Sequence, residues 1–167
     1  LPAFRMFADQ VPMNAPAVVC NGAALYDFQA EAYLETVELP EQIRQQGQSL
    51  LDRFPTAAIE AYHLDNVIHA VRPNEFTRQH QHVTHAGVVA VDSLLDVPMP
   101  LVKIMFENDY DSLTALRAFA LAQPWAADYE IFFSDKTLLE VTRKGASKGA
   151  MVRRLAARLG ISMDHVY

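Results

Sequence analysis

A lysine stands at the start of a predicted helix near the end of the chain, in the segment Ser147-Lys148-Gly149. Ser147 is a suitable N-cap because its hydroxyl can accept a hydrogen bond from a free N–H of the first turn, and Gly160 supplies the C-terminal stop. Lys148 faces the positive end of the helix dipole, which is unfavourable unless an anion lies nearby. This placement suits a lysine that holds a phosphate. Taken alone, a Lys-Gly pair at a helix start is more typical of solvated surface.

A second group of residues that could do chemistry is the histidine cluster His80, His82 and His85, which invites a metal-binding interpretation. On a helix, positions 82 and 85 share a face, whereas 80 and 82 point about 200° apart. Glu75 lies a full turn before the cluster, and no neighbouring cysteine or carboxylate completes a site. Exposed helix histidines are therefore the favoured interpretation. Cys20 follows a strand-like run and is interpreted as an inert thiol rather than a nucleophile.

Charge is distributed unevenly along the 167 residues, which suit one domain or two small ones. The apolar fraction of 51% is enough for a real core and excludes a disordered chain. The net charge is −6, yet residues 136–167 hold seven of the fourteen Lys and Arg residues against two acidic ones. No aromatic residues are interleaved with these cations, so a nucleic-acid partner is not expected and a local anion site is favoured.

The single cysteine excludes an internal disulfide framework and favours a reducing, cytoplasmic setting. The sequence shows neither a signal peptide nor an apolar run of membrane-spanning length, so no membrane association is expected. The chain begins at Leu1 without an initiator methionine, which suggests a piece of a longer protein.

Periodicity predicts strands interleaved with helices, in a mostly antiparallel sheet with helices on one face. Residues 3–10 are typical of a helix end, residues 87–100 of irregular chain, and Asn21-Gly22 of a tight hairpin. The predicted strands cover residues 17–20, 23–26, 31–39, 57–63, 66–71, 101–108, 127–133 and 136–142. The predicted helices cover residues 41–54, 74–86, 110–122 and 147–160.

Two motifs carry more information together than any single residue does. The first runs from Val18 through Asn21-Gly22-Ala23 to Asp27, and it resembles the strand end that leads into the cap domain of Cof-type phosphatases. These are the type IIB hydrolases of the haloacid dehalogenase superfamily. The second, from Leu139 through Lys148-Gly149-Ala150, is similar to that family's return from cap to core. The resemblance covers essentially the whole chain.

The resemblance implies an α+β cap domain inserted in a partial Rossmann-like α/β core. Residues 1–26 would form part of the core. Residues 27–135 would form the cap, with the predicted strand at 31–39 in its sheet, and residues 136–167 would return to the core.

The implied activity is magnesium-dependent hydrolysis of phosphate monoesters on small metabolites. Lys148 matches the family's phosphate-binding lysine, and Asn21 matches a substrate-side position. The family's nucleophilic aspartate and its metal ligands have no matching positions in this chain, so the resemblance implies that this chain alone is inactive.

An alternative of another class stays open, namely a stand-alone α+β module that binds a small anion or a partner protein. If the chain is a piece of a longer protein, the core strands on which its terminal segments would pack are absent from it. Apolar side chains of the terminal segments would lack their neighbours, which predicts self-association through Val18, Val19, Met151, Leu155 and Leu159.

Overall fold

The Asn21-Gly22 signal lies at the turn of the smaller of two sheets. In the computed structural model, which describes residues 10–65 and 67–167, strands β1 (Ala17–Val19), β2 (Ala24–Asp27) and β3 (Ala32–Thr36) pair antiparallel in the order β1-β2-β3. The short helix η1 (Cys20–Gly22) joins β1 to β2, so the predicted hairpin is confirmed. The strand predicted at 31–39 ends at Thr36 and belongs to this small sheet, so its predicted place in the cap sheet is wrong. The helix end predicted at 3–10 lies almost wholly outside the described residues.

The larger sheet has six strands in the order β6-β5-β4-β7-β9-β8. Every neighbouring pair is antiparallel except β5 with β6, so the prediction of a mostly antiparallel sheet is confirmed. Its strands are β4 (Ala58–His63), β5 (Ile68–Val71), β6 (Val88–Val91), β7 (Leu101–Glu107), β8 (Tyr129–Asp135) and β9 (Leu138–Arg143). The prediction of irregular chain over 87–100 is wrong in part, because β6 and the 3₁₀ turn η2 (Leu94–Asp96) form there.

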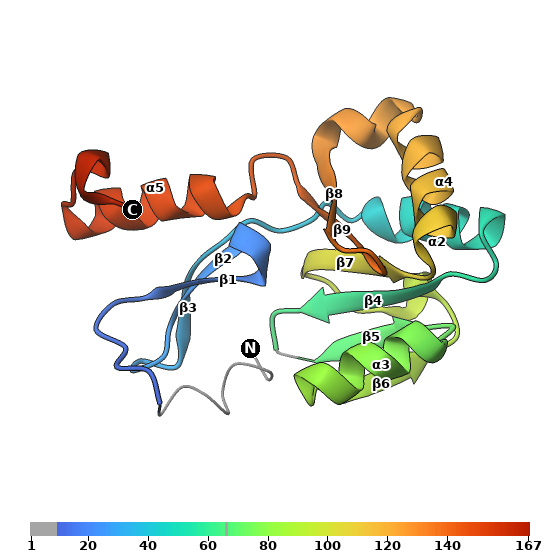
Figure 1. The fold of residues 1–167 in the computed structure, drawn as a ribbon, viewed down its shortest axis with the longest axis horizontal. Helices are drawn as coiled ribbons and strands as arrows, with labels where there is room; N and C mark the ends of the chain where they lie inside the picture. Colours follow the sequence, from blue (N-terminus) through green and yellow to red (C-terminus); the bar gives the residue numbers. More distant parts are fainter. Residues whose placement is uncertain (1–9, 66) are drawn as a thin grey trace.

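Helices α2 (Ile43–Arg53) and α4 (Tyr110–Leu121) cover one face of the larger sheet and enclose the main core (Figure 1). Both are amphipathic, and their apolar sides meet the inward-facing residues of β4 and β7, such as Ile59 and Phe106. Gly47 permits a close approach, since a Cβ there would lie 2.5 Å from a methyl carbon of Leu94. The turn η3 (Pro124–Asp128) leads from α4 into β8.

Helix α3 (Glu75–Thr84) lies over the opposite face of the larger sheet (Figure 1). Side chains alternate along a strand, so Glu60 and Glu107 point away from the core that contains Ile59 and Phe106. His80 of α3 meets both carboxylates. The prediction of helices on one face is therefore wrong. The physical reason is the parallel pair β5-β6, which needs a crossover connection, and α3 is that connection.

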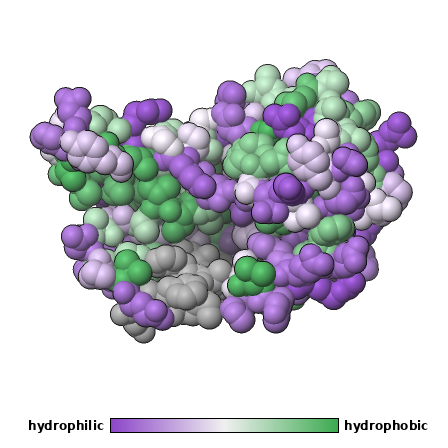
Figure 2. Space-filling model, in the orientation of Figure 1, coloured by the Kyte–Doolittle hydropathy of each residue, from purple (hydrophilic) through white to green (hydrophobic). Residues whose placement is uncertain are grey.

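Helix α5 (Lys148–Leu159) packs on the smaller sheet, where it contacts β1, β2 and η1. Figure 2 shows apolar side chains gathered over this part of the molecule. Met151 is 1% exposed, so the expectation that it lacks neighbours is wrong, whereas Leu159 is 44% exposed. An ion pair between Arg154 and Glu35 fastens α5 to β3. The turn η4 (Met163–His165) follows the helix, and no helix in the described part of the chain is long and apolar enough to span a bilayer.

Candidate functional site

The hairpin turn and the start of α5 touch through their backbones. Gly22 has a φ of 95°, and a Cβ at this position would lie 2.2 Å from the carbonyl carbon of Ser147 and 2.4 Å from the amide nitrogen of Lys148. Real Cβ atoms do not approach backbone that closely, so only glycine fits. Two motifs more than a hundred residues apart in the sequence are thus joined by direct packing.

This contact forms one wall of a pocket with a volume of about 470 Å³. Its lining residues come from the hairpin turn, strand β8 and the first turn of α5, and they are Asn21, Glu130, Phe132, Ala146, Ser147, Lys148 and Gly149. Asn21 is half-buried and adopts the left-handed conformation, with φ 57° and ψ 25°. Both residues singled out from the sequence, Asn21 and Lys148, therefore line the same pocket.

The local structure at the start of α5 agrees with the sequence prediction. Ser147 is the N-cap, and its Oγ accepts a hydrogen bond of 3.2 Å from the amide of Ala150. Gly160 ends the helix in the left-handed conformation, with φ 67°. The first amides of a helix lack intrahelical acceptors, so the helix start presents N–H groups beside the pocket.

Lys148 carries the free positive charge of this pocket. Its side chain is exposed and forms no ion pair or hydrogen bond with any residue in the described ranges. The neighbouring cation Lys144 is already paired, with its Nζ 3.1 Å from Oε1 of Glu130. A free ammonium beside free helix amides is suited to bind a small anion.

Sequence reasoning missed Glu130 and Phe132. Both lie on β8 and alternate with the core residues Tyr129 and Ile131, so the pleat turns them to the opposite face. The alternation was readable in the sequence. The sequence could not show that this face of β8 meets the start of α5, because the contact depends on how β8 and β9 join the larger sheet.

The residues around the pocket do not fit a magnesium site. Magnesium takes oxygen ligands, chiefly carboxylates. Of the residues that the structure describes, Glu130 is the one carboxylate that lines the pocket, and it is paired with Lys144. In the described part of the chain, one group of three potential ligands does come together, and it lies elsewhere, at Glu60, His80 and Glu107.

That cluster corrects the interpretation of the histidines. His82 and His85 are exposed, as expected, but the side chain of His80 is only 17% exposed. Its Nδ1 lies 3.1 Å from Oε2 of Glu60 and 3.4 Å from Oε1 of Glu107. Burial raises the pKa of the Glu107 carboxyl to about 7, and the adjacent Glu60 carboxylate raises it as well. The sequence did contain a signal for this cluster, because Glu60 and Glu107 each lie within a strand that is otherwise mostly apolar.

Cys20 behaves as the sequence suggested. It lies in η1, it is half-buried, and burial raises the pKa of its thiol above the ordinary value. A raised pKa leaves little thiolate at neutral pH, which disfavours a nucleophilic role.

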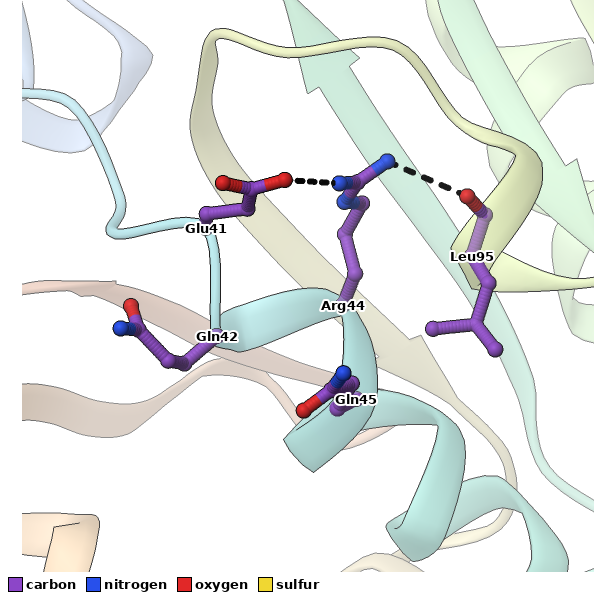
Figure 3. A pocket seen from close by; sticks show the side chains of 5 residues that line it. All are labelled: Glu41, Gln42, Arg44, Gln45 and Leu95. Atoms are coloured by element: carbon purple, nitrogen blue, oxygen red, sulfur yellow. Dashed lines mark hydrogen bonds and ion pairs between the residues drawn. The ribbon is translucent and has the colours of Figure 1, made fainter.

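A second hollow, of about 340 Å³, lies at the start of α2 and is shown in Figure 3. Its cation, Arg44, already pairs with Glu41 and donates a 3.1 Å hydrogen bond to the carbonyl oxygen of Leu95. Because these partners occupy the guanidinium, this hollow is less suited to hold an anion than the one beside Lys148.

Fold and site together define an α/β protein with a candidate anion site where its smaller sheet meets its C-terminal helix. A family model described as haloacid dehalogenase-like hydrolase matches residues 1–167. The chain belongs to the haloacid dehalogenase-like hydrolase family.

Solved structures share the fold at low sequence identity. A haloacid dehalogenase-like hydrolase from Bacteroides thetaiotaomicron superposes with a TM-score of 0.81 at 16% identity, over 96% of this chain and 61% of that one. A haloacid dehalogenase-like hydrolase from B. subtilis superposes with a TM-score of 0.78 at 16% identity, over 98% of this chain and 65% of that one. BT4131, a sugar phosphatase of haloacid dehalogenase subclass IIB, superposes with a TM-score of 0.76 at 15% identity, over 96% of this chain and 58% of that one. The chain thus spans about three fifths of the length of these structures. A search among curated proteins finds no match.

Proposed function

We propose that this chain supplies the phosphate-binding lysine and the substrate-covering sheet of a haloacid dehalogenase-type phosphatase that acts on small phosphorylated metabolites. The observation that supports this most strongly is the packing of Gly22 on the backbone of Ser147 and Lys148. It brings together the two motifs that carry the family resemblance, beside a pocket with a free ammonium. The family match also disfavours the alternative of a stand-alone binding module.

In this proposal Lys148 neutralises negative charge on the phosphate oxygens. Phosphoryl transfer depends mainly on positioning and on electrostatic stabilisation of the equatorial oxygens. An ammonium next to helix N–H groups supplies that charge without having to break an existing ion pair. Asn21, which lines the same pocket from the hairpin turn, contributes an amide and would contact the substrate beside the phosphate.

We assign the larger sheet, with α2, α3 and α4, to the cap domain, and the smaller sheet with α5 to the core. The boundary expected after residue 26 leaves β3 on the cap side, although β3 pairs with β2. The boundary expected after residue 135 divides the hairpin of β8 and β9. Boundaries after Thr36 and Arg143 agree better with the strand pairing.

Magnesium dependence belongs to the proposal for the complete enzyme. Within the described ranges the pocket beside Lys148 offers one carboxylate, so no catalytic step is assigned to a metal here. We expect this chain alone to release no phosphate from a generic ester, with or without magnesium. Among the described residues of the pocket, the Glu130 carboxylate is paired with Lys144 and the Ser147 hydroxyl caps α5, so neither is a suitable nucleophile. Turnover above the uncatalysed background that survives repurification would contradict this. The single cysteine supports a cytoplasmic setting as part of the same proposal.

Phosphate binding by the chain itself tests the proposal. Titration with inorganic phosphate, followed by ¹⁵N NMR, should shift the amide signals of Lys148 and Gly149. Lys148→Ala should weaken binding by roughly 10–100-fold, since a hydrogen bond to a charged group contributes about 1.5–3 kcal/mol. Lys144→Ala is the matched control, because Lys144 is exposed and paired with Glu130. Equal weakening in the two variants would refute the assignment of Lys148.

A further inference from the structure

Two buried carboxylates and an imidazole converge on the face of the larger sheet that α3 covers. Glu60 comes from β4, Glu107 from β7 and His80 from α3. The side chains of Glu60 and Glu107 are 1% and 0% exposed. One ligand atom from each of the three residues lies within 4.8 Å of the other two. None of them lines the pocket beside Lys148, so this is a separate cluster.

Negative charge is in excess on this face. The neighbouring strand residues Lys103 and Glu140 form their own buried ion pair, with 2.8 Å between Nζ and Oε2. Lys103 also lies 4.1 Å from the centre of the Tyr62 ring. Among the described residues, that pairing leaves Glu60 and Glu107 with His80 as their one close cationic partner. When both carboxylates are ionised, even a protonated imidazole leaves one negative charge uncompensated, and an uncompensated buried charge is strongly destabilising.

The hydrogen bonding of the two carboxylates is incomplete as well. Tyr62 donates a hydrogen bond of 2.7 Å to Oε2 of Glu60. Oε1 of Glu60 and both carboxylate oxygens of Glu107 have no hydrogen-bond partner within the described residues. Buried polar atoms are normally satisfied, so three such oxygens in one cluster can accept a positively charged partner.

We propose that Glu60, His80 and Glu107 bind a divalent transition-metal ion of the Zn²⁺ type. Bonds of about 2.0–2.2 Å in tetrahedral geometry place neighbouring ligand atoms roughly 3.3–3.6 Å apart. His80 Nδ1 lies 3.1 Å from Oε2 of Glu60 and 3.4 Å from Oε1 of Glu107. Small shifts of these side chains would therefore bring the ligand atoms to the spacing that the ion requires. The free Oε1 of Glu60 offers a further ligand atom. The hydroxyl of Tyr62 orients the Glu60 carboxylate from outside, as partners behind metal ligands do.

The ligand set selects against magnesium, because an imidazole nitrogen suits zinc, iron and nickel, whereas magnesium prefers oxygen ligands alone. The three ligands come from a helix and two neighbouring strands, so the ion would fasten α3 to β4 and β7. Its role is structural. It is independent of phosphate chemistry at Lys148, and the test below does not depend on the proposed function.

Metal binding to the 167-residue chain tests the proposal directly. After chelation and dialysis, the chain should take up one Zn²⁺ per molecule in calorimetric titration and give the visible absorption bands of tetrahedral Co²⁺. A Zn²⁺ concentration about a hundred times Kd should raise Tm by roughly 5–10 °C. Mg²⁺ at the same concentration should leave Tm unchanged. Absence of stoichiometric Zn²⁺ uptake by the wild-type chain would overturn the proposal.

Glu107→Gln separates metal binding from folding. The glutamine keeps the shape and removes the buried charge, so the metal-free variant should fold and give the wild-type circular dichroism spectrum. Its affinity for Zn²⁺ should fall at least tenfold. His82→Gln is the matched control, since His82 is exposed on the same helix, and it should bind like the wild type. Undiminished Zn²⁺ affinity in Glu107→Gln, or equal loss in both variants, would refute the site.

Discussion

At the scale of single residues, the site depends on one glycine. Gly22 has a positive φ and lies against the backbone of Ser147 and Lys148, so it meets two demands that only glycine meets together. Its contact sets the position of the α5 start relative to Asn21. The phosphate-binding geometry that we propose therefore depends on a residue that binds nothing itself.

Gly22→Ala should destabilise the chain by at least about 1–3 kcal/mol, the usual cost of inserting atoms into a well-packed position, because the partner here is backbone that cannot rotate away. Gly149→Ala is the matched control: a Cβ at Gly149 meets nothing within 4 Å, and alanine in the first turn should be neutral or stabilise by up to about 1 kcal/mol. Urea unfolding measures both. A Gly22→Ala variant as stable as Gly149→Ala would show that the two backbones are not in contact.

The residues of the site differ in how far the sequence could predict them. Ser147 and Gly160 follow local rules of helix capping, and the structure has both caps, and Lys148 in the first turn, where the sequence predicted them. The partners of His80 could not be predicted in this way. Glu60 and Glu107 are far from His80 in the sequence, and they reach it only because α3 crosses the face opposite the main core.

At the scale of elements, strand order determines which backbone amides are protected. Strand β7 lies between β4 and β9 and is buried along its whole length. Strands β6 and β8 form the two edges of the larger sheet, and an edge strand leaves every second N–H unpaired.

Hydrogen exchange should therefore be slowest in β7, followed by β9 and β4, and distinctly faster in β6 and in residues 92–97. Strands β8 and β9 belong to one hairpin, but only β9 is paired on both sides, so the exchange rates of these two strands provide a control within the same molecule. Mass spectrometry of peptides resolves these segments. Exchange in 101–107 as fast as in 88–97 would contradict the sheet as described.

Elements with a clear amphipathic period were predictable. Helices α2 and α4 lie close to their predicted ranges because their apolar sides face one core. Strand β6 was not predictable, since its four residues are all aliphatic, without alternation, and lie in a stretch rich in turn residues. Once β6 was missed, nothing required a crossover, so the sequence could not place α3 on the opposite face of the sheet.

At the scale of the whole molecule, the end of the chain presents apolar surface. Leu159, Ile161 and Met163 are each 43–44% exposed at the end of α5 and just beyond it. Grouped apolar side chains favour association. We expect the chain to associate as its concentration rises, and light scattering measures this.

Leu159→Lys should shift that association to higher concentration, whereas Arg153→Lys, exposed on the same helix, should not. If the wild-type chain stays strictly monomeric with α5 fully ordered, the burial of Met151 and Ala156 on the smaller sheet is sufficient, and the expected self-association is wrong.

The most direct measurement of the central claim is kcat/KM of Lys148→Ala in the complete enzyme, with a small phosphate ester as substrate. Loss of one preorganised donor at a developing charge should cost about 2–4 kcal/mol of transition-state stabilisation, or roughly 30- to 1,000-fold in rate. Lys144→Ala should stay close to the wild type, because its ammonium is paired with Glu130. A large, selective loss at Lys148 is the predicted result. Equal effects at the two lysines, or no effect at Lys148, would contradict its assignment as the phosphate-binding residue.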